Sequence, residues 1–172
     1  KFINTLNKNN HTNLIGKKYV LAASTHNDEE MQIIKEWLKL KVTKILLVIV
    51  PRHPERLGDI LAQLPLSDIN IAIRSKEEKI KKDTQIYIAD TFGEMDDLIY
   101  FSEFIFMGGS LVDHGGQNFI EAAKYGKAIV VGPFMYNFIE ETEEFLKKSA
   151  LLMIKNSEMI KPTFDKLLRS KN

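Results

Sequence analysis

Four glycines fall within nine residues at the start of the stretch GGSLVDHGGQNFIEAAKYG, which runs from Gly108 to Gly126. Glycine has no Cβ, so the backbone N–H groups around Gly115 and Gly116 can approach an anion closely. A helix expected from Asn118 would add free N–H donors and a partial positive charge. This combination suits a phosphate group. The alternative is a glycine turn that only shapes a strand-to-helix connection.

The stretch differs from both common phosphate-binding motifs. It lacks the Gly-Lys-Ser/Thr of a Walker loop, and its glycine spacing is not that of the dinucleotide fingerprint. Two polar residues then open the predicted helix. Glu121 is favoured on the first turn by the helix dipole alone, yet beside a phosphate it could accept two hydrogen bonds from ribose hydroxyls. Asn118 is either the N-cap or a second polar ligand contact.

A basic stretch, PRHPER at residues 51–56, follows a strongly apolar run. Prolines on both sides of the Arg52–His53 pair stiffen the loop, and the guanidinium of Arg52 could bind a phosphate through two hydrogen bonds. An ordinary surface arginine is the alternative. His53 could donate a hydrogen bond or stack on a base, although a histidine that merely packs explains it as well. Arg56 is interpreted as a solvated helix residue.

Two further polar stretches follow apolar runs. In DTFGE, Gly93 and Glu94 lie at a predicted strand-to-helix turn whose backbone could read the edge of a base. An ordinary helix cap is the alternative. STHNDEE offers Ser24, Thr25 and His26, and His26 could meet a donor sugar or a phosphate. The glutamates that follow, Glu29 and Glu30, are more simply helix-start acids.

Other kinds of site find little support. Asn27 and Glu30 match a capping box at the start of a helix. The four histidines lack the spacing of a metal site, and no G-x-S-x-G elbow marks a serine hydrolase. We therefore predict no metal and no cofactor. The histidines are His11, His26, His53 and His114.

Short apolar runs alternate with helical patterns, and these elements must position the polar stretches. The predicted strands are 19–23, 45–50, 69–73, 85–89, 104–107, 128–131 and 151–154. The predicted helices are 28–40, 54–64, 94–101, 118–125, 137–149 and a tail interrupted or restarted at Pro162. This alternation predicts an α/β fold with a Rossmann-like, doubly wound parallel sheet. The polar stretches follow the first, second, fourth and fifth strands, where such sheets bind ligands.

Composition bounds the class of protein. The 172 residues are 44% hydrophobic and 27% charged, which is ordinary for a globular domain. A net charge of +1 argues against a general nucleic-acid binder, and the absence of cysteine excludes disulfide scaffolds. The longest strongly apolar run, Ile45–Val50, is too short to span a membrane. We predict a polar lead-in over 1–18 and one domain over 19–172. The first residue is Lys1, so we expect a piece of a longer protein.

Five motifs together resemble the carboxyl-terminal half of the 3-deoxy-D-manno-oct-2-ulosonic acid (Kdo) transferases, over roughly residues 19–145. They are AASTHNDEE, PRHPER, DTFGE, GGSLVDHGGQNFIEAA and VVGPFMYNF, in that order. These bacterial enzymes move Kdo from CMP-Kdo to a lipid A precursor in lipopolysaccharide biosynthesis. The resemblance implies a GT-B glycosyltransferase with two Rossmann-like domains facing each other across a cleft. This chain would be the half that binds the donor nucleotide.

Carried over by position, the resemblance implies a role for each motif. Arg52 and His53 would lie at the CMP phosphate and base. Gly93 and Glu94 would line the cytidine pocket.

The glycine stretch would complete the donor site. Gly115 and Gly116 would give backbone access, Asn118 would contact the phosphate region, and Glu121 would bind the ribose hydroxyls. Gln117 departs from the histidine expected in many relatives, which changes one polar contact. Further candidate contacts are Ser24, His26, Ser110 and Gln117.

The family's amino-terminal domain carries the acceptor site, the membrane association and a glutamate general base, and nothing in this chain corresponds to it. We therefore expect the chain alone to be soluble and to bind CMP-Kdo without transferring sugar. The resemblance implies that the full-length enzyme is an inverting transferase at the cytoplasmic face of the bacterial inner membrane. We expect no nucleic-acid partner.

Two other functions stay open on the residues alone. The first is another GT-B enzyme, such as a different nucleotide-sugar transferase or a UDP-sugar epimerase, which would prefer uridine. The second is an interaction domain whose strand-end residues are only caps and turns. It would bind no nucleotide.

Overall fold

Seven short strands form one parallel sheet in the computed structural model, which describes residues 14, 16–64 and 68–170. Across the sheet the strands follow the order β3-β4-β2-β1-β5-β6-β7. Their bounds are β1 (Lys18–Thr25), β2 (Ile45–Pro51), β3 (Ile71–Ile73), β4 (Ile86–Ile88), β5 (Ile105–Met107), β6 (Ile129–Val131) and β7 (Leu152–Met153). The predicted doubly wound α/β fold is confirmed, with five of the strands shorter than predicted.

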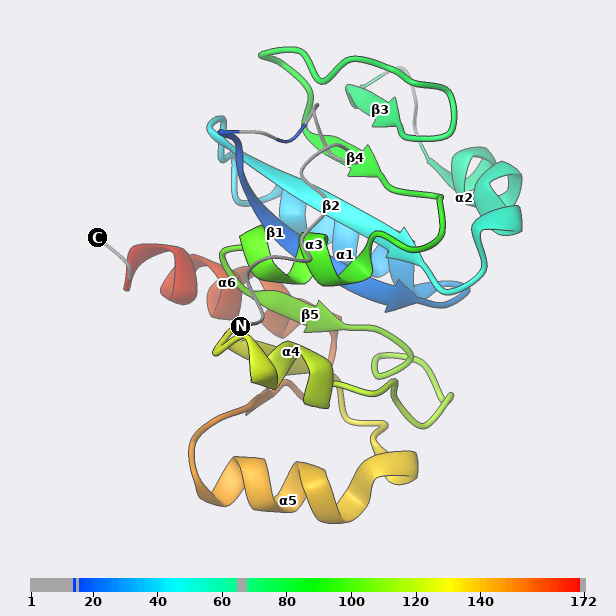
Figure 1. Cartoon of the computed structure of the whole chain (residues 1–172). Helices are drawn as coiled ribbons and strands as arrows, with labels where there is room; N and C mark the ends of the chain where they lie inside the picture. Colours follow the sequence, from blue (N-terminus) through cyan, green and yellow to red (C-terminus); the bar gives the residue numbers. More distant parts are fainter. Residues whose placement is uncertain (1–13, 15, 65–67, 171–172) are drawn as a thin grey trace.

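Helices cover both faces of this sheet (Figure 1). Their bounds are α1 (Glu29–Leu38), α2 (Leu57–Gln63), α3 (Met95–Phe101), α4 (Ile120–Lys124), α5 (Ile139–Lys147) and α6 (Ile160–Arg169). Three single turns of 3-10 helix precede α2, α5 and α6, namely η3 (Pro54–Arg56), η4 (Tyr136–Phe138) and η5 (Ser157–Met159). Helices α1, α2 and α6 pack on one face, and α3 and α4 on the other.

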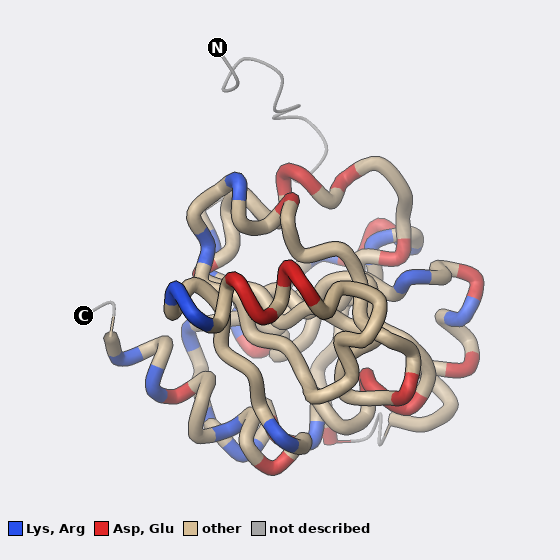
Figure 2. The backbone as a smooth tube through the Cα atoms, turned by 90° about the horizontal axis from the view of Figure 1, so that it is seen from below, with Lys and Arg blue, Asp and Glu red and all other residues tan. Residues whose placement is uncertain are grey.

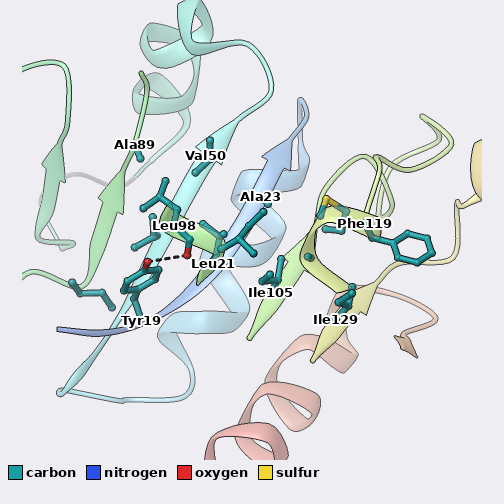
Figure 3. Packing of buried hydrophobic residues seen from close by; sticks show 14 of the residues in the cluster. Tyr19, Leu21, Ala23, Val50, Ala89, Leu98, Ile105, Phe119 and Ile129 are labelled. Carbon is teal, nitrogen blue, oxygen red and sulfur yellow. Dashed lines mark hydrogen bonds between the residues drawn. The ribbon is translucent and has the colours of Figure 1, made fainter. Parts of the chain in front are cut away.

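Alternating residues of β1 show how the two core layers arise. Tyr19 and Leu21 belong to the cluster under α3 and α4, whereas Val20 and Ala22 belong to the cluster under α1 and α6. In Figure 3 the Tyr19 hydroxyl donates to the carbonyl of Leu98 in α3 at 2.8 Å. A strand buried on both faces must be apolar throughout, and this explains the continuous apolar runs of the sequence.

The strand order reverses direction at β1. On one side of β1 the chain passes from β2 to the edge strand β3 and then back to β4, which lies between them, and β5, β6 and β7 follow in order on the other side. All strands are parallel, so the loops after them gather at one edge. The crevice beside such a switch point, here between β1 and β5, is where open α/β sheets bind ligands.

The first strand begins one residue before the predicted strand 19–23. Residues 1–13 and 15 of the predicted lead-in lie outside the described residues, but Leu14 is buried in the core and β1 begins at Lys18. Among the described residues, no helix has the length and apolar character needed to cross a bilayer.

Two helix predictions need correction. The predicted capping box of Asn27 and Glu30 is wrong: α1 begins without a side-chain cap, and both side chains instead accept hydrogen bonds from Arg56. Pro162 does not interrupt the last helix, since α6 begins at Ile160 and a proline in the first turn removes no intrahelical hydrogen bond.

The charge pattern of α5 follows the prediction. Ion pairs four residues apart form between Glu143 and Lys147 and between Glu144 and Lys148. Figure 2 looks onto this helix and shows acidic residues along its first turns and basic residues at its end. Acids at the start and lysines at the end both suit the helix dipole.

Candidate functional site

Three of the four polar strand ends converge on one pocket of about 170 Å³. Four of the predicted site residues line it: Ser24 after β1, Arg52 after β2, and Gly93 with Glu94 in the turn before α3. Phe92 also lines the pocket and is 78% exposed. The walls are formed by residues from distant parts of the chain, brought to one edge of the sheet as expected.

Ser24 occupies an irregular position at the end of β1. The pairing of β1 with β2 shifts register between Ala23 and Thr25, and Ser24 has a left-handed φ of 53°. Gly108 at the end of β5 lies against this bulge, and a Cβ there would be only 2.3 Å from the carbonyl oxygen of Ser24. Glycine at 108 thus lets two strand ends meet closely at the switch point.

The side chains of Arg52 and His53 are exposed after β2. The backbone N–H of Arg52 donates to the carbonyl of Thr25 at 2.9 Å, so the loop is tied to β1. An exposed guanidinium on a fixed backbone can meet an anionic ligand at the pocket.

The interpretation of Arg56 as a solvated residue is wrong. Its guanidinium contacts both carboxylate oxygens of buried Glu30, at 3.1 and 3.3 Å, and also Asn27 at 3.2 Å. Glu30 accepts a further hydrogen bond from the Thr25 hydroxyl at 3.0 Å. A buried carboxylate needs such partners, and the pair ties the loop after β2 to the start of α1.

Gly93 and Glu94 have different surroundings. Gly93 has a φ of +82° and is exposed, with no atom within 4 Å of the position a Cβ would take. Glu94 is buried and accepts hydrogen bonds from Nη2 and Nε of Arg74, at 2.9 and 3.2 Å, and from the Thr91 hydroxyl. The Glu94 side chain therefore anchors the turn, whose backbone is left to face the pocket.

Glu29 is more than the helix-start acid that the sequence suggested. It is fully buried, and its carboxylate accepts four backbone N–H groups. Burial raises the pKa of Glu29, while the hydrogen bonds from Leu111, Gly109, His26 and Ser110 act in the opposite direction.

His26 lies in a cluster of rings beside the connection between β5 and α4, which contains Gly108, Gly109, Gly115 and Gly116 and is called the glycine loop below. Its ring centroid is 3.7 Å from that of His114 and 6.1 Å from that of His53. Its Nε2 is 3.0 Å from Nε2 of Gln117, so two of the further candidate residues are in contact. The described residues contain no group of three or more His, Asp or Glu arranged to hold a metal ion.

Burial lowers the pKa of His26 to about 4, and nearby His114 and His53 act in the same direction. The ordinary value in an unfolded chain is about 6.5. Between these values the unfolded chain binds a proton that the folded protein does not. We therefore expect stability to fall as the pH drops from about 6.5 toward 4.

Urea unfolding at several pH values measures this effect. His26→Gln should flatten the slope across that window, whereas the control His53→Gln should keep most of it. An unchanged slope in His26→Gln would contradict the assignment.

Gly115 and Gly116 pack against the segment after β6. A Cβ on Gly115 would lie 2.3 Å from Nδ2 of Asn137, and one on Gly116 would lie 2.4 Å from Sδ of Met135. Both glycines have positive φ, at 91° and 80°. Close packing and backbone conformation thus account for glycine here, and access for a phosphate stays a prediction. Ser110 is fully buried: its hydroxyl donates to the Met107 carbonyl and accepts from the N–H of Gly132.

Asn118 and Glu121 stand apart from the pocket lining. Helix α4 begins at Ile120, two residues later than predicted, and the Asn118 side chain accepts its N–H at 2.9 Å. Glu121 is exposed on the first turn, as expected. The structure therefore groups Ser24, Arg52, Gly93 and Glu94 in one pocket and brings His26 into contact with Gln117, without bringing α4 into the pocket lining.

Sequence reasoning missed Glu29, Glu30 and Arg56. Their position in the sequence could have indicated a role, because two adjacent acids follow the first strand and a second arginine follows the next strand. Apart from His26 and Thr25, their partners lie 26 to 82 residues away in the chain, and periodicity does not reveal such pairs.

The chain resembles proteins of known activity along most of its length. It is 33% identical over 162 residues to a 3-deoxy-D-manno-octulosonic acid transferase of Rickettsia bellii, covering 92% of this chain and 38% of that protein. It is 32% identical over 154 residues to the transferase of the same name from Haemophilus influenzae, covering 88% and 36%. The chain thus spans little more than a third of these relatives. No protein-family model matches it.

Two solved structures share the fold. The crystal structure of the C-terminal CMP-Kdo binding domain of WaaA from Acinetobacter baumannii superposes with a TM-score of 0.85 at 30% identity, covering 92% of this chain and 84% of that one. The spinosyn rhamnosyltransferase SpnG, with a TM-score of 0.53 at 10% identity over 88% of this chain and 37% of that one, supports the fold alone. This chain therefore belongs to the 3-deoxy-D-manno-octulosonic acid transferase family and shares its fold with the C-terminal CMP-Kdo binding domain of WaaA.

Proposed function

We propose that this chain binds CMP-Kdo as the donor-nucleotide domain of a Kdo transferase. The observation that carries the proposal is the likeness to the CMP-Kdo binding domain of WaaA, at a TM-score of 0.85 over 92% of this chain. The pocket at the strand ends supports it, because its lining includes predicted donor contacts from three separate loops.

Each part of the pocket suits one part of the donor. Arg52 lines the pocket and His53 is the next residue; both side chains are exposed and suit the phosphate and base. The Glu94 carboxylate is held by Arg74 and Thr91, so we assign base recognition to the backbone around Gly93 rather than to that side chain.

The glycine stretch supplies the remaining proposed contacts. We assign Glu121 to the ribose hydroxyls and Asn118 to the phosphate region, with Gly115 and Gly116 beside them. Because Asn118 and Glu121 lie outside the pocket lining, a nucleotide that uses both groups must extend from the pocket along the carboxyl edge of the sheet toward α4.

The full-length enzyme would transfer Kdo to a lipid A precursor at the inner membrane. We place the acceptor site and the general base in the length of the relatives that this chain does not span. The base takes the proton of the acceptor hydroxyl, whose oxygen bonds to the anomeric carbon of Kdo as the bond to the CMP phosphate breaks. Arg52 would stabilise the charge that grows on the departing phosphate.

Calorimetric titration of the chain with CMP and with UMP tests the proposal. We expect CMP to bind and the Kd for UMP to be at least about tenfold higher. A site that hydrogen-bonds the edge of cytosine leaves groups unpaired against uracil, and this mismatch costs about 1.4 kcal/mol or more. Incubation with CMP-Kdo and acceptor should yield no transfer. Preference for UMP would move the chain to another nucleotide-sugar specificity, and binding of neither would overturn the proposal for the isolated domain.

A further inference from the structure

One carboxylate is enclosed where the fold usually receives a ligand. Oε1 of Glu29 accepts the N–H groups of Ser110 at 3.0 Å and Leu111 at 2.9 Å. Oε2 accepts those of Gly109 at 2.7 Å and His26 at 3.1 Å. The side chain is 0% exposed, so both oxygens are satisfied entirely by the protein backbone.

The donors form an anion-binding concavity. Three of them are successive residues, 109–111, and Gly109 has a left-handed φ of 65° that turns its N–H group toward the same point as the next two. Successive backbone N–H groups in this arrangement make a nest that binds phosphate in many proteins. Here the nest lies at the end of β5, beside β1, which is the switch point of the sheet.

An internal anion has two consequences for a ligand. Glu29 already occupies the nest, so a phosphate cannot enter it and must bind farther out. The positive potential of the nest is also neutralised by the carboxylate. The charge of the phosphate must therefore be met by side chains such as exposed Arg52 and by the region around Asn118.

The hydrogen bonds in the nest also fix the loop that leads to α4. The carbonyl of Gly109 accepts the N–H of Gly116 at 2.7 Å, so the root and the end of the loop are joined. Gly109 lies against the rings of His26 and His114. A Cβ on Gly109 would be 3.2 Å from Cδ2 of His26 and 3.4 Å from Cδ2 of His114. Holding residues 109–111 therefore holds the segment that immediately precedes Asn118.

We propose that Glu29 is a positioning residue for the donor site: it fills the switch-point nest, fixes the glycine loop, and directs the ligand phosphate to a position outside the nest. This inference deepens the proposed function and rests on it for the identity of the ligand. The anchoring of residues 109–111 by a buried carboxylate is testable without any nucleotide.

Amide hydrogen exchange tests the anchoring. In the native protein the amides of Gly109, Ser110 and Leu111 should be protected. In Glu29→Gln, which keeps the size but turns an NH₂ group toward backbone donors, these amides should exchange on the order of tenfold faster or more. The matched control is Glu36→Gln, which removes a charge from the same helix where Glu36 pairs with Lys39. Equal protection in Glu29→Gln and the native chain would overturn the anchoring.

Nucleotide binding tests the positioning. We expect CMP to bind Glu29→Gln on the order of tenfold more weakly, because a loosened loop moves Asn118 out of position and its contact with the ligand is then mostly lost. Glu36→Gln should bind CMP as the native chain does. Faster exchange at residues 109–111 with unchanged CMP affinity would leave Glu29 a purely structural residue and overturn the positioning role.

Replacing the carboxylate from solution gives a second, independent test. Glu29→Ala opens space in the nest, and sodium formate should restore loop protection and part of the CMP affinity, whereas sodium chloride at equal ionic strength should not. An equal response to both salts would overturn the anion-nest proposal. If the native chain binds no CMP, the proposed function fails, while the exchange and formate results still decide whether Glu29 fills the nest.

Discussion

Gly132→Ala is expected to lower the free energy of unfolding by more than about 3 kcal/mol, as expected when a core is overpacked against rigid backbone. A Cβ at this position would lie 2.1 Å from the carbonyl oxygen of Ser110 and 2.4 Å from its carbonyl carbon. The same carbonyl accepts the N–H of Phe134 at 3.0 Å, and the Ser110 hydroxyl accepts the N–H of Gly132 at 2.8 Å. Any movement that relieves the clash breaks these bonds between the ends of β5 and β6.

Urea unfolding of the variant, with Gly58→Ala as its control, measures this cost. Gly58 lies in α2, has no atom within 4 Å of its Cβ position, and has no positive φ. Alanine there should raise stability by about 0.5 to 1 kcal/mol, because it restricts the unfolded chain and favours the helix. A Gly132→Ala protein within about 1 kcal/mol of the native chain would contradict the packing argument.

Arg52→Ala is expected to weaken CMP binding about 10- to 100-fold, since hydrogen bonds between charged groups contribute about 1.5 to 3 kcal/mol. The guanidinium is exposed at the pocket, and Glu29 closes the backbone nest that would otherwise hold a phosphate. Stability should barely change, because the side chain is outside the core. Calorimetry at two salt concentrations should also show that CMP affinity depends less on salt in the variant, because the variant lacks the positive charge of the Arg52 side chain at the ligand.

Arg169→Ala is the matched control for this experiment. It removes the same charge from the end of α6, where Arg169 makes an exposed ion pair with Asp165 at 2.9 Å. Such pairs contribute little to stability, and this one lies away from the pocket lining. Equal CMP affinity in Arg52→Ala and the native chain would remove Arg52 from the proposed site.

The candidate site was predictable in part. The sequence placed Ser24, Arg52 and the Gly93–Glu94 pair after three separate strands, and parallel strands necessarily bring their carboxyl ends to one edge. It did not reveal that the Glu94 side chain is held by Arg74, because the partner lies 20 residues away and on another strand end.

The sequence by itself determined the alternation of strands and helices, and hence the parallel α/β fold, because periodicity and apolar runs are local properties of a chain. It could not determine which acids are buried. Glu29 and Glu30 look alike as helix-start residues, yet one binds amides about 80 residues away and the other binds Arg56.

Only the tertiary structure decided these partners. A buried carboxylate must find donors wherever the fold brings them, and the order of the strands puts the loop after β5 beside the start of α1. The same holds for Gly108 and Gly132, whose need for glycine comes from backbone atoms of another strand end. Packing sets the distances between residues that are far apart in sequence, and no local sequence pattern predicts them.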